Sequence, residues 1–232
     1  MKLSILSGGA AAGVVNGLRE QFEKSHSCQI DATFSAVGAM RELLLAGEAC
    51  DLVILTRAMV EGLIQGGQVL ENSCVSLGIV RTGVAIKDGD PSPKIATRTD
   101  LLEAFKGARG IYFPDPEKAT AGIHVYNVLK QLGLERTKEK QLHIFPNGAT
   151  AMAAMAASSE AGLIGSTQVT EINITPGVRL IGMLPKEFEL ATDYCLGICT
   201  ASQNPQLASD FAKLLISDGA SPLRQKIGFE LN

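Results

Sequence analysis

Short apolar runs typical of β-strands alternate with amphipathic stretches typical of α-helices, and this alternation most constrains the fold of the chain. The predicted strands are 2–6, 29–34 and 51–55 in a first series, and 110–113, 141–145 and 161–164 in a second. The predicted helices are 14–24, 38–46 and 58–65, then 100–105, 121–132 and 149–157. Repeated strand–helix units of this kind predict an α/β fold with parallel sheets.

Two long apolar strands, near 76–87 and 192–199, join the two series. Two crossings between two α/β series predict two lobes connected by a hinge. The C-terminal helices near 208–216 and 222–229 would complete the first lobe. The expected boundaries are therefore 1–80 plus 198–232 for lobe 1, and 81–197 for lobe 2.

The composition argues against several classes of protein. Lys and Arg number 21 against 24 Asp and Glu, so the formal net charge is −3 and no basic face for a nucleic acid is expected. No window approaches the ~20 apolar residues of a membrane span. The five cysteines include no C-x-x-C pair, so neither a metal site nor a cofactor is predicted, and buried free thiols are the plainest interpretation.

The first fifteen residues, MKLSILSGGAAAGVV, have the outline of a secretory signal. Ser7 and Gly8 break the apolar run, however, and Val14, Leu18 and Phe22 recur at the spacing of a packed helix. We therefore expect a cytoplasmic protein as the sequence is written, or a periplasmic one if a signal was removed. The free thiols also favour the cytoplasm.

Candidate ligand positions lie where predicted strands end and helices begin, because open α/β sheets bind ligands there. The unpaired N–H groups at a helix start attract anions, and small residues let an anion approach them. A Ser, Thr or Asn at such a place also serves as an ordinary helix cap without any ligand. The candidates in the first lobe are Ser7, Gly8, Gly9, Ala10, Ser35, Ala36, Val37, Gly38, Thr56 and Arg57. In the second lobe, 115–122 and 147–150 precede helices in the same way.

Four segments carry a resemblance to a known family: small residues followed by a helix containing QFEK, then TFSAVGAM, LLLAGEACDLVILT and FPDPEKATAGIHVYNVLKQLGL. In this order they resemble the molybdate-binding proteins of ABC importers, which are type II periplasmic-binding proteins. The resemblance runs from Lys2 to about Phe229. It implies two lobes, a hinge, and a cleft that closes over a small anion, with an ABC importer as partner if the protein is exported.

The ligand positions of that family are only partly present. The resemblance places its two hydroxyl side chains at Ala10 and Val37 and its tyrosine near Gly165, where this chain has none of those groups. The positions that contribute backbone N–H groups fall on Ala121 and Thr150. Four nearby hydroxyls, those of Ser7, Ser35, Ser166 and Thr167, are possible substitutes.

These losses bear on the ligand. Each missing charge-assisted hydrogen bond costs about 1.5–3 kcal/mol. Two or three losses would remove most of a micromolar affinity of about 8 kcal/mol. An organic carboxylate is therefore expected rather than molybdate, with Arg57 and Arg81 as candidate bidentate partners. The alternative for each arginine is a surface position or an ion pair.

A second hypothesis is an enzyme on the same scaffold. Some proteins that resemble this family are isomerases of small unsaturated polycarboxylates, such as aconitate isomerase. Their 1,3-proton shift needs an acid or base near the cleft and a stabiliser for the developing negative charge. His124 and Lys118 are the candidates here, and His124 is equally an ordinary helix residue. The sequence contains no Ser/His/Asp order, no phosphate loop and no cluster of metal ligands.

Overall fold

The computed structural model describes residues 1–231 and divides the chain into two compact units. Unit 1 contains Met1–Val80 together with the segment from Thr192 onward, and unit 2 contains Arg81–Ala191. The predicted second crossing at 197–198 differs from this division. Residues Tyr194–Ile198 pair with a strand of unit 1, and this pairing assigns them to unit 1.

Unit 1 contains three strand–helix units, a further strand and the C-terminal helices. In chain order these are β1 (Lys2–Gly8), η1 (Gly9–Ala11), α1 (Ala12–His26), β2 (Gln29–Ser35), α2 (Val37–Leu45), β3 (Leu52–Thr56), α3 (Arg57–Gln65), β9 (Ala191–Ile198), α8 (Pro205–Ile216), η4 (Asp218–Ala220) and α9 (Ser221–Ile227). A long strand, β4 (Val75–Lys87), begins in unit 1 and continues into unit 2.

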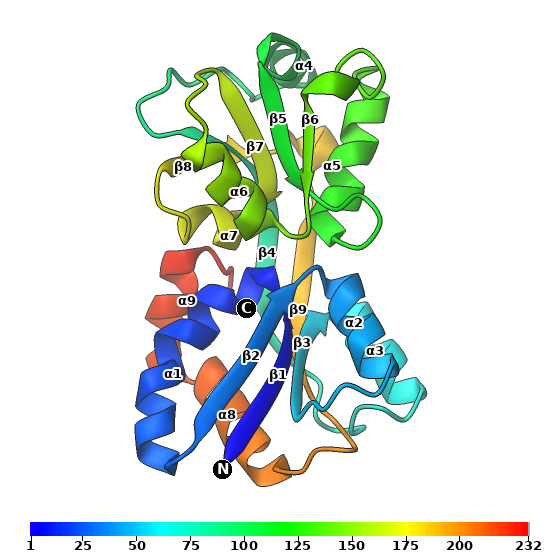
Figure 1. The fold of residues 1–232 in the computed structure, drawn as a ribbon, viewed down its shortest axis with the longest axis vertical. Helices are drawn as coiled ribbons and strands as arrows, with labels where there is room; N and C mark the ends of the chain where they lie inside the picture. The colour runs from blue at the N-terminus through cyan, green and yellow to red at the C-terminus, as the bar shows by residue number, and fades with distance from the viewer. Residues whose placement is uncertain (232) are drawn as a thin grey trace. The chain divides into compact units, whose positions relative to one another are not determined.

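The strand order β2-β1-β3-β9 places helices on both faces of the unit 1 sheet. β1 is parallel to β2 and β3, and β9 is antiparallel to β3. The chain steps from β1 to β2 in one direction and then back past β1 to β3. Right-handed crossovers therefore put α1 and α2 on opposite faces. Figure 1 shows α1 and α8 on one side of these strands and α2 and α3 on the other.

Unit 2 repeats this plan with β8 as an addition. Its elements are α4 (Arg98–Gly107), β5 (Gly110–Pro114), α5 (Thr120–Gln131), η2 (Glu139–Gln141), β6 (Leu142–Phe145), α6 (Gly148–Ala157), β7 (Leu163–Gln168), α7 (Val169–Asn173), β8 (Val178–Met183) and η3 (Lys186–Phe188). The order is β4-β7-β5-β6, and β8 pairs with β4. β5 is parallel to both β6 and β7.

The side chains of these strands alternate between two separate cores, as the pleat requires. Ile111 and Phe113 pack with Phe105 of α4 and Leu129 of α5. Tyr112, between them in sequence, faces the other way into a core formed with α6 and α7. Each face of the unit 2 sheet is therefore covered by its own helices.

The predicted elements agree with the structure apart from shifts at their ends, the largest in β7, which was predicted at 161–164, and two further differences. β4 is continuous, although its sequence suggested an interruption at 81–83, because Thr82 and Gly83 pair with β7. The short helix α7 was not predicted, since five residues give too little periodicity. The predicted α/β class and the division into two units are confirmed.

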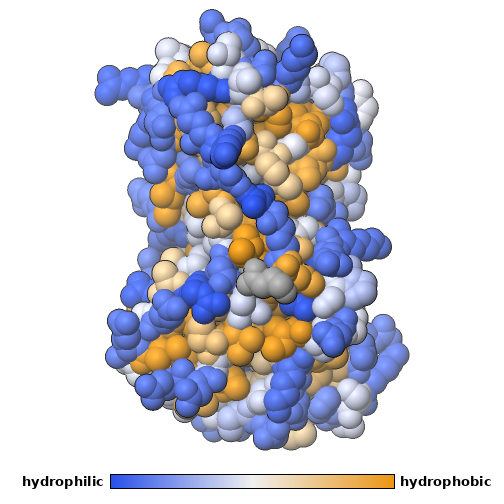
Figure 2. All heavy atoms as spheres, turned by 180° about the vertical axis from the view of Figure 1, so that it is seen from behind, coloured by the Kyte–Doolittle hydropathy of each residue, from blue (hydrophilic) through white to orange (hydrophobic). Residues whose placement is uncertain are grey.

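The surface is mixed in character. Figure 2 shows hydrophilic residues over most of the visible face, with hydrophobic patches between them. Within residues 1–231, no helix has the length and apolar character needed to cross a membrane.

Candidate functional site

Three helix starts meet at one edge of the unit 1 sheet. Gly8 is aligned with Ser35, and Ser7 with Ile54, so the carboxyl ends of β1, β2 and β3 lie side by side. η1, α2 and α3 begin directly after these ends, and no side chain caps any of them. By contrast, α4 and α6 each carry a capping box. The unit 1 edge therefore presents helix N–H groups without side-chain acceptors.

The small residues at this edge are a packing requirement. A Cβ added at Gly8 would lie 2.6 Å from Cγ1 of Val37 and 3.2 Å from Cε1 of Tyr194. Gly9 and Ala10 are likewise buried. Ala36 and Val37, at the start of α2, have apolar side chains, so only backbone N–H groups are available as donors there. Tyr194, which lies opposite Thr56 on β9, was not anticipated from the sequence.

The hydroxyls at this edge fall into two groups. Ser7 is buried and donates to the Gly8 carbonyl at 2.9 Å, so its hydroxyl is already used. Ser35 and Thr56 are half-buried, and within the described part of the chain their hydroxyls make no hydrogen bond. Gly38, in the first turn of α2, is also half-buried.

Arg57, the first residue of α3, is held in a fixed orientation. Its Nε donates to Oδ2 of Asp193 at 2.6 Å, and Oδ1 of Asp193 accepts from Ser76 at 2.5 Å. The hydrogen bond to Asp193 raises the pKa of Arg57, which keeps the guanidinium charged. Nη1 lies 3.9 Å from both Glu61 and Cys74, and Nη2 has no partner among residues 1–231. One nitrogen of a partly exposed guanidinium is therefore left for a ligand.

Arg81 has a different role. It forms an ion pair with Glu189, which belongs to the same unit. The ion-pair alternative therefore holds for Arg81, and its charge is already matched by a carboxylate.

In unit 2, the start of α5 is also free of a side-chain cap. Asp115 accepts from the N–H groups of Glu117 and Lys118 at 2.7 and 3.0 Å, which shapes the turn before the helix. Ala121 is buried in the first turn of α5. Its neighbour Gly122 packs against the end of β5, because an added Cβ would lie 2.1 Å from the Asp115 carbonyl oxygen.

The start of α6, in contrast, is already occupied by a carboxylate of the chain. Glu171 is only 4% exposed, and it accepts from the Gly148 N–H at 3.1 Å and from the Thr167 hydroxyl at 2.6 Å. Burial raises the pKa of Glu171, while hydrogen bonds from Thr167, Ala149, Gly148 and Gln168 lower it. The contact between Glu171 and the start of α6 could not be predicted from the sequence, because Glu171 lies on the unpredicted helix α7.

Three predicted ligand contacts in unit 2 are therefore engaged within the protein. The Thr150 N–H donates to Oδ1 of Asn147 at 2.9 Å, as part of the capping box of α6. Thr167 donates to Glu171, and Ser166 donates to the Gly83 carbonyl at 2.9 Å. The Ser166 and Thr167 contacts are buried, where polar groups are almost always hydrogen-bonded, whereas the Thr150 contact is exposed.

The position assigned to the family tyrosine lies against the side chains of the unit 2 core. A Cβ at Gly165 would lie 2.4 Å from Cε of Met152. A tyrosine at this position would therefore require the methionine side chains of the unit 2 core to repack.

The two candidate acid–base residues lie around α5. Nε2 of His124 is 2.7 Å from the Phe188 carbonyl, so this nitrogen carries the proton and donates it. Lys118 lies in the turn before α5, where its backbone N–H donates to Asp115. Among the described residues, no group of three or more His, Cys, Asp and Glu side chains has the arrangement of a metal site.

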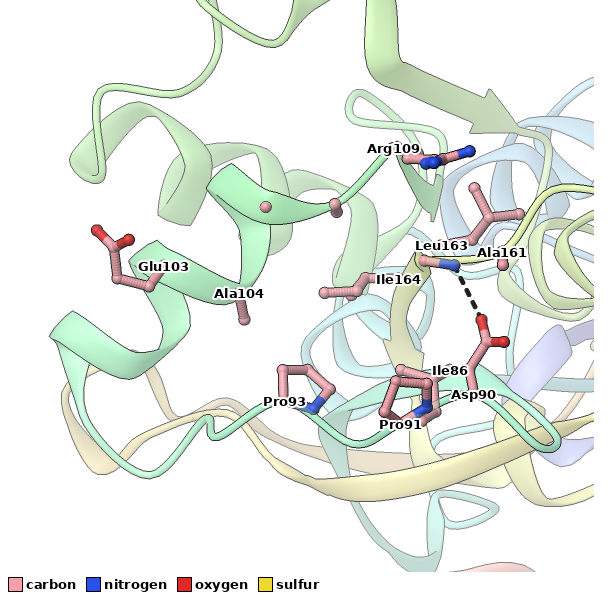
Figure 3. Close-up of a pocket in the computed structure, with 13 residues that line it drawn as sticks. Ile86, Asp90, Pro91, Pro93, Glu103, Ala104, Arg109, Ala161, Leu163 and Ile164 are labelled. Atoms are coloured by element: carbon pink, nitrogen blue, oxygen red, sulfur yellow. Dashed lines mark hydrogen bonds between the residues drawn. The ribbon is translucent and has the colours of Figure 1, made fainter.

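Unit 2 also has a cavity of about 440 Å³ that contains none of the predicted residues. Pro91, Pro93, Ala104 and Ile164 face it, and Asp90 bonds across it to the Gly162 N–H at 3.0 Å (Figure 3). Its walls are mainly apolar, and the charged residues that line it are Arg109, Asp90 and Glu103.

Comparisons with known proteins agree with this architecture. The family described as bacterial extracellular solute-binding protein matches residues 3–230. An aconitate isomerase from a Pseudomonas species is 24% identical over 234 residues, covering 98% of this chain and 87% of that protein.

Two solved structures illustrate the shared fold. The periplasmic molybdate-binding protein of Azotobacter vinelandii superposes with a TM-score of 0.81 at 17% identity, over 99% of each chain. The substrate-binding protein of an ABC transporter from Agrobacterium tumefaciens has a TM-score of 0.73 at 13% identity, over 97% of this chain and 77% of that one.

Proposed function

Because the chain belongs to the bacterial extracellular solute-binding protein family, we propose that it binds a small organic anion, through a carboxylate, at the unit 1 edge. The observation that carries the proposal is the combination found there. Three uncapped helix starts surround the unused hydroxyls of Ser35 and Thr56, and Arg57 is fixed by Asp193 with Nη2 open.

Each part of this edge suits a carboxylate. Uncapped N–H groups favour negative charge, and the hydroxyls add neutral donors. A guanidinium held by one carboxylate through Nε retains its outer nitrogens for a second. Ala10 and Val37 supply no side-chain donor for a tetrahedral oxyanion such as molybdate, and neither does Gly165, where the resemblance places a tyrosine. These features support an organic anion over molybdate.

A thermal-shift panel tests this proposal with molybdate, sulfate, citrate, cis-aconitate and trans-aconitate as probes. A ligand at 100 times its Kd stabilises the folded state by about 2.7 kcal/mol. We expect such a shift from at least one of the carboxylates and none from molybdate.

Substitution of Arg57 provides the matched comparison. Arg57→Gln is expected to abolish the shift, whereas Arg41→Gln, an exposed arginine on α2, is expected to preserve it. A shift with molybdate, or an unchanged carboxylate shift in Arg57→Gln, would refute the proposal.

The alternative function is isomerisation of a small unsaturated polycarboxylate by a 1,3-proton shift. The similarity to an aconitate isomerase over nearly the whole chain favours it. His124 is the candidate acid–base residue, and its ring is oriented by the Phe188 carbonyl. Lys118 is the second candidate.

Incubation with cis- or trans-aconitate in deuterated water separates the two functions. A binding protein leaves both compounds unchanged and free of deuterium, whereas an isomerase interconverts them. Loss of that interconversion in His124→Gln, with binding retained, would assign the proton transfer to His124.

Family membership also supports an extracellular or periplasmic location and an ABC importer as partner, in keeping with the expectation for an exported form. Fractionation of cells that produce the native gene product tests the location. Recovery of the protein only from the cytoplasm would contradict it.

A further inference from the structure

Four of the five cysteines lie in two pairs, although the sequence spacing gave no sign of this. The side chains of Cys195, on β9, and of Cys74, which lies just before β4, are close enough to interact, and Cys74 raises the pKa of the Cys195 thiol. Ser76, two residues after Cys74, donates to Asp193, two residues before Cys195. The two contacts have the alignment of neighbouring antiparallel segments, and β4 and β9 are neighbours in the strand order. Cys74 and Cys195 therefore lie opposite each other.

The two thiols of this pair have different surroundings. Cys74 is partly exposed, and Nη1 of Arg57 lies 3.9 Å from its sulfur. Reactive cysteines are typically accessible and lie beside a cation. Cys195 is fully buried. Burial raises the pKa of its thiol, and Asp193 and Cys74 raise it further. Cys74 is therefore the thiol that a reagent in solution reaches first.

The second pair provides a contrast within the same unit. Cys50 and Cys199 also interact with each other, but both are buried. The groups that act on Cys199 are Cys50 and Asp51, and both raise the pKa of its thiol. No cation is among them, so this pair has neither the access nor the charge that favours reaction.

We propose that Cys74 and Cys195 form an intramolecular disulfide when the protein meets a small-molecule disulfide oxidant. The thiolate of Cys74 attacks one sulfur of the oxidant, whose sulfur–sulfur bond breaks, and the first thiolate leaves and takes up a proton. The thiol of Cys195 then loses its proton, and the resulting thiolate attacks the Cys74 sulfur of the mixed disulfide. The second thiolate of the oxidant leaves and takes up a proton. The two cysteines lose two electrons and two protons, and the oxidant gains them as two thiols.

This site adjoins the proposed ligand edge through Arg57, but the disulfide needs only contacts within unit 1 and no bound ligand. The family description places such proteins outside the cell, where disulfides form and persist.

Oxidised glutathione is the probe for the test, with the full chain as the protein. After incubation and denaturation, titration of free thiols is expected to show the loss of two of the five. Digestion without reduction, followed by mass spectrometry, is expected to give a linked peptide containing Cys74 and Cys195.

The variants separate this pair from the others. Cys74→Ser and Cys195→Ala should each form no intramolecular disulfide under the same conditions. Cys28→Ser and Cys50→Ser should still lose two thiols. A glutathione adduct that persists on Cys74 without any linked peptide would overturn the proposal, as would a Cys50–Cys199 peptide that forms first. The wild-type peptide map decides the matter even if a variant fails to fold.

Discussion

The start of α5 depends on the absence of a side chain at Gly122, and Gly122→Ala tests that dependence. The added Cβ would lie 2.1 Å from the Asp115 carbonyl oxygen and 2.4 Å from that of Pro114. A carbon–oxygen contact needs about 3.3 Å, so the helix start must move by roughly 1 Å. Backbone carbonyls at the end of β5 cannot rotate away as a side chain would.

Two opposing effects set the magnitude. Overpacking costs about 1–3 kcal/mol, and a rigid backbone neighbour places this site at the upper end. Alanine in a helix recovers up to about 1 kcal/mol relative to glycine. We therefore expect Gly122→Ala to lose about 2 kcal/mol, which lowers Tm by about 4–8 °C in a chain of this size.

Urea denaturation followed by circular dichroism gives the free energy of unfolding. Gly62→Ala is the matched control, because Gly62 is also helical and an added Cβ meets nothing within 4 Å. That variant should be as stable as the wild type or up to about 1 kcal/mol more stable. If Gly122→Ala is as stable as the wild type, the close packing of α5 on β5 does not fix the position of α5.

Two further predictions concern buried carboxylates. The pKa of Glu171 is raised above 4.5, so the folded state holds this proton more tightly than the unfolded state. Its stabilising contribution is therefore present below pH 4.5 and lost as pH rises through the raised pKa; Glu171→Gln should remove this part of the pH dependence in urea titrations, and an unchanged profile would contradict it. Asp51 accepts hydrogen bonds from the Ser4 and Asn204 N–H groups at 2.8 and 3.1 Å, among others. Asp51→Ala should lose at least about 2 kcal/mol, since each buried donor left unpaired costs about 1–3 kcal/mol; the exposed Asp31→Ala should lose under about 1 kcal/mol, and equal losses would refute the argument.

Local sequence determined most of the fold. Strand and helix periodicity depends on neighbouring residues, so the strands and the longer helices from β1 to α9 could be predicted, with shifts at their ends. The junctions after β1, β2 and β3 could also be predicted, because parallel strands bring their carboxyl ends to one sheet edge. Arg57 was identified there from its place after a buried strand.

Only the tertiary structure decided which of these groups remain available. Glu171 fills the start of α6, Asp193 orients Arg57, and Cys74 meets Cys195, all through contacts between segments that periodicity cannot connect. A hydrogen bond or a thiol contact depends on the packing of whole elements to within an ångström. The pattern of residue types along the chain therefore predicts where such groups occur, and the packed structure determines what each of them bonds.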